Sequence, residues 1–175
     1  NYPSNMLYAR MLRAVANIYD DPSLIPEAEV IEEYIRKNTM INGFFCDNAY
    51  RRENGSLELS GECTETCQYY AFYMGIATPE TYPELWKKLT TDFGPQRKQT
   101  GAYPEIFFSN AFIGNYLRLD LLFRYGLADR MVEEIRGYFL YMADKTGTLW
   151  EHDSDFASCN HGFASYVAVV IKKIQ

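Results

Sequence analysis

A chain of 175 residues suits one domain and can bury a hydrophobic core. The net charge of −6 argues against a nucleic-acid partner, because phosphate backbones are bound by basic surfaces. No apolar run approaches the roughly 20 residues of a membrane span, so we expect no membrane partner. Aromatic residues make up 16% of the chain, which suits either an aromatic-rich core or a carbohydrate cleft.

The N-terminal part of the chain predicts two helices. Apolar residues recur at steps of three and four before Asp20-Asp21-Pro22, where we expect the first helix to end. Pro26 begins the second helix, and Asn42-Gly43 ends the pair. The apolar stripe expected to face the core consists of Leu7, Met11, Val15 and Ile18 in the first helix and Ala28, Ile31 and Ile35 in the second.

The helical rhythm stops between residues 44 and 61. Asn54-Gly55 is a strong turn signal, so this segment is expected to form a loop or a short hairpin. Irregular segments between regular helices often carry function.

Helical patterns then resume to the end of the chain. They cover approximately residues 64–74, 79–93, 109–125, 130–142 and 163–174. The total is about seven helices, and the short turns between most of them indicate antiparallel hairpins. No stretch alternates convincingly as a strand, so we predict an all-α fold. The longer loops, 39–62, 94–108 and 144–158, are expected to gather on one face.

Cys46, Cys63, Cys67 and Cys159 match no Cys-x-x-Cys zinc or redox spacing. Cys63 and Cys67 lie one helical turn apart and share a face. We interpret the cysteines as buried structural thiols, with a disulfide or a metal site as the alternatives. We therefore predict no metal and no cofactor.

A group of polar and aromatic residues lies just before the last helix. Trp150 has a flat apolar face, and Glu151 is a proton acceptor. Asn160 and His161 offer hydrogen bonds ten residues later. A stacking platform, a base and orienting donors are the equipment of a carbohydrate site, although Trp150 could equally belong to the core.

Three blocks of the sequence carry a resemblance to a known family. The first runs from Glu62 to Phe72 and is followed by Gly75-Ile76-Ala77; the second runs from Ser109 to Leu117. The third joins Gly147-Thr148-Leu149-Trp150-Glu151 to Ser158-Cys159-Asn160-His161. In order and spacing they resemble the C-terminal half of the catalytic domain of α-L-rhamnosidases, glycoside hydrolase family 78 of the six-hairpin glycosidases.

This resemblance implies that residues 1–175 form one domain, the C-terminal portion of an (α/α)₆ barrel of twelve helices. It also implies inverting hydrolysis, with Glu151 as the general base and His161 in contact with the sugar. Asn160 would hold either the loop or the sugar. The acidic motif that carries the family's general acid is not found, so the isolated chain should be an inactive fragment. A partial barrel would expose apolar surface, and we therefore expect self-association.

Two alternatives remain at this point. Paired helices with aromatic faces would equally serve a non-catalytic interaction or carbohydrate-binding module. Another six-hairpin activity, such as that of a fucosidase, would also fit the resemblance.

Overall fold

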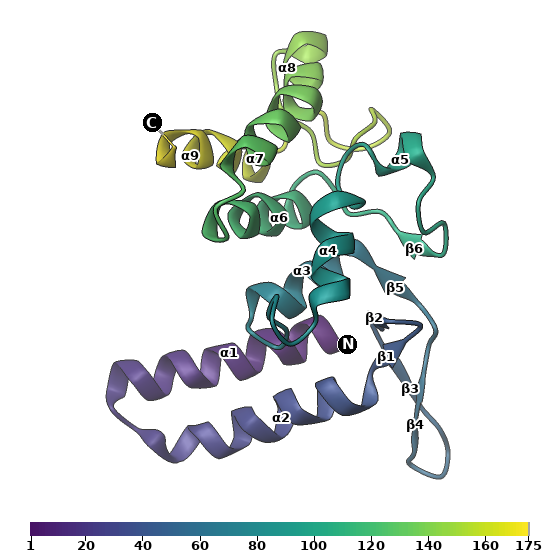
Figure 1. Ribbon diagram of the computed structural model, residues 1–175, viewed down its shortest axis with the longest axis vertical. Coiled ribbons are helices and arrows are strands. Elements are labelled where there is room, and N and C mark those ends of the chain that lie inside the picture. The colour runs from purple at the N-terminus through teal and green to yellow at the C-terminus, as the bar shows by residue number, and fades with distance from the viewer. Residues whose placement is uncertain (175) are drawn as a thin grey trace. The chain divides into compact units, whose positions relative to one another are not determined.

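The computed structural model describes residues 1–174. The chain divides into two compact units, both rich in helix (Figure 1). Unit 1 consists of Asn1–Lys87 together with Glu105–Phe107. Unit 2 consists of Lys88–Pro104 together with the chain from Phe108 onward.

Unit 1 begins with an antiparallel helical hairpin, α1 (Tyr2–Tyr19) and α2 (Ile25–Asn38), joined by a short 3₁₀ turn (Figure 1). The Asn1 side chain caps α1 by accepting a hydrogen bond from the Ser4 backbone N–H at 3.0 Å. Asp21 caps the connecting turn in the same way, through the N–H of Ser23 at 3.0 Å. The first two predicted helices are therefore confirmed.

The buried face of α1 is not the one that we predicted. Leu7, Met11 and Ile18 are 49%, 46% and 72% exposed. A second row of residues packs inward instead, and it consists of Met6, Ala9, Leu12 and Ala16. Both rows repeat every three to four residues, so periodicity could not tell them apart. The small side chains of the inner row let α2 approach closely, and Ala28 of α2 packs against that row as predicted.

Three two-stranded sheets lie in unit 1, where we expected at most a short hairpin. β1 (Met40–Ile41) pairs with β2 (Phe44–Phe45), and β3 (Ala49–Arg51) pairs with β4 (Leu57–Leu59), both antiparallel. β5 (Cys63–Thr64) runs parallel to β6 (Ile106–Phe107). Two or three residues are too few to show alternation. The hairpin expected at Asn54-Gly55 is confirmed, because it joins β3 to β4.

The remainder of unit 1 is built around α3 (Glu65–Tyr73). The Thr64 hydroxyl caps this helix by accepting from the Cys67 N–H at 3.0 Å. The buried Gln68 amide exchanges two 2.8 Å hydrogen bonds with the Phe45 backbone, fastening the helix to β2. The next helix, α4 (Pro83–Thr91), begins in unit 1 and continues into unit 2.

Unit 2 is helical apart from its loops. It contains the single turn α5 (Arg97–Thr100), then α6 (Ile113–Arg124) and α7 (Ala128–Glu134). A π-helical segment (Ile135–Phe139) joins α7 to α8 (Leu140–Thr146), and a 3₁₀ turn (Gly162–Ser165) leads into α9 (Tyr166–Lys173). All seven predicted helices are present, and α5 is an addition. None of the described helices, within residues 1–174, is long and apolar enough to cross a membrane.

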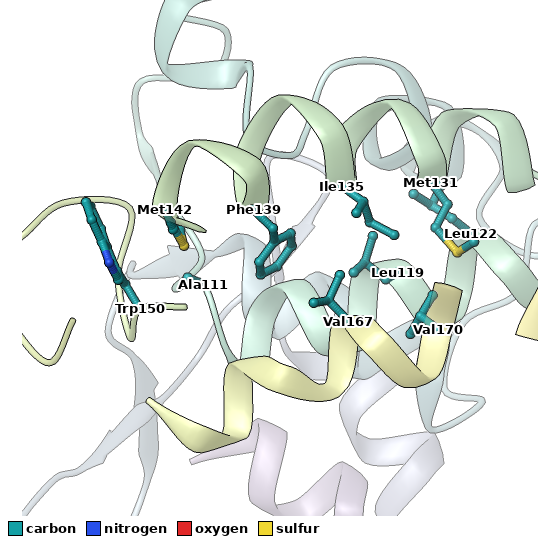
Figure 2. Packing of buried hydrophobic residues seen from close by; sticks show 10 residues of the cluster. All are labelled: Ala111, Leu119, Leu122, Met131, Ile135, Phe139, Met142, Trp150, Val167 and Val170. Atoms are coloured by element: carbon teal, nitrogen blue, oxygen red, sulfur yellow. The ribbon is translucent and has the colours of Figure 1, made fainter. Parts of the chain in front are cut away.

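The core of unit 2 joins α6, the α7–α8 helix and α9 (Figure 2). Leu119 and Leu122 come from α6, and Val167 and Val170 come from α9. The chain after α8 closes one end of this core through Trp150, which lies beside Met142 in Figure 2. The loop predicted to carry the site therefore begins at a residue of the hydrophobic core, Trp150.

Candidate functional site

The loop that carries Glu151 is fixed by backbone hydrogen bonds on both sides. The Glu151 N–H donates to the Ser158 carbonyl at 2.9 Å, and the His161 N–H donates to the Leu149 carbonyl at 2.8 Å. The Ala111 N–H, just before α6, donates to the Glu151 carbonyl at 3.0 Å. These bonds bring residues 150–151 and residues 160–161 of the predicted site together. They also fix the position of Glu151 against the start of α6.

Trp150 belongs to the core. Its side chain has no exposed surface, and its indole N–H donates to the Thr146 hydroxyl at 2.8 Å. Tyr141 packs edge-on against the ring, at a centroid distance of 5.6 Å. A ring buried on both faces offers no surface to a sugar, so of the two roles considered for Trp150 the structure favours the structural one.

The Glu151 side chain, by contrast, reaches solvent. Its relative exposure is 33%, and Nε2 of His152 lies 3.9 Å from its Oε1 atom. The His152 ring in turn stacks on Phe156, with ring centroids 4.8 Å apart and planes 26° apart. Glu151 therefore presents a partly exposed carboxylate beside two stacked rings, an arrangement compatible with a proton-accepting role.

Ion pairs hold the part of the loop beyond Glu151. Asp153 pairs with Lys98 of α5, which joins two of the three long loops. Asp155 accepts a hydrogen bond from the Lys145 ammonium of α8 at 3.0 Å, and this bond lowers the pKa of the Asp155 carboxyl. Both aspartates therefore tie the loop to neighbouring helices.

His161 and Asn160 lie at the far end of the loop. The His161 ring packs against Phe112, with ring centroids 4.6 Å apart, and is partly exposed. Asn160 is exposed. The His161 backbone bond to Leu149 keeps both residues on the same clamped loop as Glu151.

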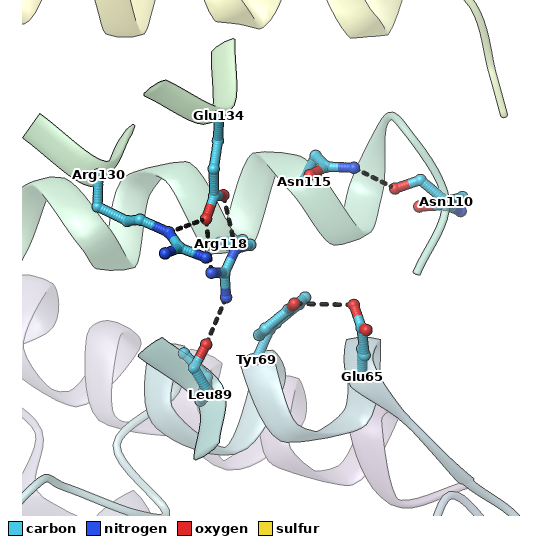
Figure 3. Close-up of polar contacts among 8 residues, drawn as sticks. All are labelled: Glu65, Tyr69, Leu89, Asn110, Asn115, Arg118, Arg130 and Glu134. Carbon is cyan, nitrogen blue, oxygen red and sulfur yellow. Dashed lines mark hydrogen bonds and ion pairs between the residues drawn. The ribbon is translucent and has the colours of Figure 1, made fainter. Parts of the chain in front are cut away.

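A second carboxylate of unit 2, Glu134, is engaged in the fold. It lies 1% exposed and accepts two 2.7 Å hydrogen bonds from the Arg118 guanidinium (Figure 3). Arg130 adds a third at 2.8 Å, while Arg118 also donates to the Leu89 carbonyl at 2.6 Å. Such a fully paired carboxylate is a structural anchor rather than a proton acceptor.

A carboxylate of unit 1, Glu65, is buried as well. It is 1% exposed and accepts a hydrogen bond from the Tyr69 hydroxyl one turn along α3, at 2.9 Å (Figure 3). Glu65 and Glu134 therefore contrast with the solvent-reaching Glu151.

All four cysteines are free thiols, and Cys46, Cys63 and Cys67 are buried. Burial raises the pKa of the Cys63 thiol to about 12 and that of the Cys67 thiol well above its ordinary value. Such thiols are poor nucleophiles and poor metal ligands, because both roles need the thiolate. Within residues 1–174, no group of three or more potential His, Cys, Asp or Glu ligands could hold a metal ion.

Sequence reasoning missed two aromatic neighbours of the site. Phe112 contacts His161, and Phe156 stacks on His152. Phe112 lies within the block that resembles the family, so its proximity to His161 could have been suspected. Phe156 carried no signal, since a lone aromatic in a polar loop fits many roles.

Comparison with known proteins gives a structural likeness and no sequence match. No protein-family model matches the chain, and no curated protein matches it. The fold is similar to a crystal structure of the GH78 family rhamnosidase of Bacillus sp. GL1, with a TM-score of 0.71 and 17% sequence identity. The match covers 96% of this chain and 18% of that chain. The helical fold predicted from the sequence is thus confirmed apart from the short strands of unit 1, and it is similar to the fold of a segment of that GH78 rhamnosidase.

Proposed function

We propose that this chain is part of a glycoside hydrolase that cleaves terminal α-L-rhamnosides with inversion, and that Glu151 is its general base. The observation that carries this proposal is the setting of Glu151. Its carboxylate is one-third exposed, on a backbone clamped to Ser158 and Ala111. A base must be held in place and still reach a water molecule, and this setting supports both requirements.

The proposed reaction needs two carboxyl groups on opposite sides of the scissile bond. Glu151 takes a proton from a water molecule whose oxygen attacks the anomeric carbon. As the glycosidic bond breaks, a carboxylic acid protonates the leaving oxygen. In inverting enzymes the two carboxyl groups stand about 6.5–9.5 Å apart, leaving room for that water. We propose that the acid is supplied by another part of the enzyme.

The other residues of the loop have supporting roles in this proposal. His161 contacts the sugar, with its ring orientation set by Phe112 at 4.6 Å. Exposed Asn160 either donates a hydrogen bond to the sugar or steadies the loop. Trp150, the residue directly before the proposed base, contributes by anchoring the chain in the core with its buried ring.

The main test uses the full-length product of the reading frame that contains these residues, with a chromogenic α-L-rhamnoside. We expect Glu151→Gln to lower kcat by about 10²–10⁴-fold, because the amide cannot accept the proton. Glu133→Gln is the matched control, since Glu133 is exposed on α7 of the same unit. Full activity of Glu151→Gln would exclude Glu151 as the base.

A second measurement separates a base from a merely structural residue. In Glu151→Ala, added azide should restore turnover, since a small anion needs no deprotonation, and should yield the glycosyl azide of inverted configuration. Absence of rescue from a folded variant would count against the base role. The 175-residue chain alone should be inactive; hydrolysis by it would refute the need for an outside acid.

The same assay with a panel of chromogenic sugars tests the substrate class. The rhamnoside should be preferred over the fucoside. A preference for the fucoside would be consistent with the proposed glycosidase activity but would change the proposed substrate from a rhamnoside to a fucoside.

A further inference from the structure

Two buried thiols of unit 1, those of Cys46 and Cys63, lie opposite each other on neighbouring extended segments. The Asp47 N–H donates to the Glu62 carbonyl at 2.8 Å, and the two cysteines are the residues just beyond this bond. The Cys46 N–H donates away from this pairing, to the Thr39 carbonyl at 2.8 Å. The cysteines therefore take a non-hydrogen-bonded position, where opposite Cα atoms are about 4.5 Å apart. Disulfide bonds need a Cα separation of about 4.4–6.8 Å.

A bulge at Gly61 produces this alignment. The β3–β4 ladder, continued without interruption, would place Cys46 opposite Glu62. Gly61 has a φ angle of +81°, the left-handed conformation that glycine adopts in one common type of β-bulge. The extra residue shifts the pairing by one position and brings Cys63 opposite Cys46.

The two thiols are buried and in contact. Cys46 has no exposed surface, and Cys63 is 4% exposed. Burial raises the pKa of the Cys63 thiol to about 12, and the charge of the Cys46 thiol and a hydrogen bond between the two side chains add to this rise. The Cys46 sulfur also lies 3.4 Å from the Ser60 hydroxyl oxygen. The two sulfur atoms are thus neighbours in a part of unit 1 that is closed to solvent.

The other two thiols are less well placed for a bond. Cys67, in the first turn of α3, directs its thiol to the Cys46 carbonyl at 3.6 Å. Cys159 belongs to unit 2. The cross-strand position and the contact between thiols therefore single out Cys46 and Cys63.

We propose that Cys46 and Cys63 form a disulfide bond when the protein folds in the presence of a small-molecule disulfide such as oxidised glutathione. The thiolate of one cysteine attacks the oxidant, forming a mixed disulfide and releasing one thiol. The thiolate of the other cysteine then attacks the protein sulfur of the mixed disulfide and releases the second thiol. Two protein thiols are thereby oxidised, the oxidant is reduced to two thiols, and the protons lost by the cysteines end on the released thiols.

Burial determines when this bond forms. Thiol–disulfide exchange needs a thiolate, and the raised pKa of Cys63 makes that thiolate scarce in the folded protein at neutral pH. The exchange therefore belongs to the folding chain, in which both cysteines are still accessible. Once formed, the buried bond is shielded from reductants and links the two ends of the segment that carries the β3–β4 hairpin.

The test maps the bond in the full-length product of the reading frame. The protein is unfolded and reduced, refolded in a buffer of reduced and oxidised glutathione, and treated with iodoacetamide to block the remaining thiols. Trypsin then separates Cys46 from Cys63 at Arg51, and a glutamate-specific protease separates Cys63 from Cys67 at Glu65. We expect mass spectrometry to find the Cys46 peptide joined to the Cys63 peptide, with Cys67 alkylated, and to find the two peptides apart after reduction.

Two variants control the assignment. Cys159→Ser should keep the cross-link, whereas Cys63→Ser should abolish it and leave Cys46 alkylated. Alkylation of both Cys46 and Cys63 in the refolded unsubstituted protein would overturn the proposal, as would a bond from Cys46 to Cys67. The mapping requires no hydrolysis of a rhamnoside, so the disulfide and the proposed reaction are tested independently of each other.

Discussion

Two glutamates of unit 2 lie in opposite environments. Glu134 is 1% exposed and receives hydrogen bonds from Arg118 and Arg130. The Glu151 side chain is 33% exposed, and its fixed contacts are made by the backbone. The difference teaches that a carboxylate saturated by guanidinium groups serves stability. A carboxylate whose backbone is anchored while its oxygens reach solvent is free for chemistry.

The largest effect on stability is expected from removing Glu134. Glu134→Ala should lower the free energy of unfolding by about 3–5 kcal/mol, because it leaves the Arg118 charge buried and unpaired. Urea unfolding of the 175-residue chain measures the change, with exposed Glu133→Ala as the control. The paired replacement Arg118→Met with Glu134→Leu should recover much of the loss; a loss below 1 kcal/mol in the single variant would contradict the assignment.

An intermediate effect is expected at Gly94, which approaches the same guanidinium. A Cβ at this position would lie 2.6 Å from Nε of Arg118, and the φ angle of +106° disfavours any side chain. Arg118 cannot move aside, since Glu134 and the Leu89 carbonyl hold it. Gly94→Ala should therefore cost about 1–3 kcal/mol in the same urea measurement. The exposed Gly55→Ala, with nothing within 4 Å, controls for the φ effect alone.

The smallest effect on stability is expected at Glu151 itself. Glu151→Gln should shift the free energy of unfolding by no more than about 0.5 kcal/mol, because its clamp uses backbone atoms that the substitution keeps. Thermal unfolding of the two chains checks this. A loss comparable to that of Glu134→Ala would show that the carboxylate is a structural group and would erase the contrast between the two residues.

The helices were predictable from the sequence, because apolar spacing, caps and breakers all act locally. The face of α1 was not, since Met6 and Leu7 begin two apolar rows of the same period. The pairing of β5 with β6 was also beyond reach: it joins Cys63 to Ile106, and neither strand is long enough to show a pattern. Nor did any sequence signal mark the π-helical segment at Ile135–Phe139 within the helical pattern of residues 130–142.

For the candidate site, the motif located the loop but not the environment of each side chain. Glu151, Asn160 and His161 lie on one clamped segment, as their proximity in the sequence suggested. Trp150 could have faced either way, because an indole satisfies a core and a sugar equally well. Only its hydrogen bond to Thr146 and its complete burial settle its direction.

The bond between the Glu151 N–H and the Ser158 carbonyl closes residues 152–157 into a short loop module. The chain enters and leaves this module at two neighbouring points. The length and composition of the module can therefore change while Glu151 and Ser158 keep their places. Natural variation or directed evolution can therefore alter what the module touches while Glu151, the proposed base, keeps its position beside α6. The clamp separates the segment that fixes the proposed base from the segment whose sequence can vary.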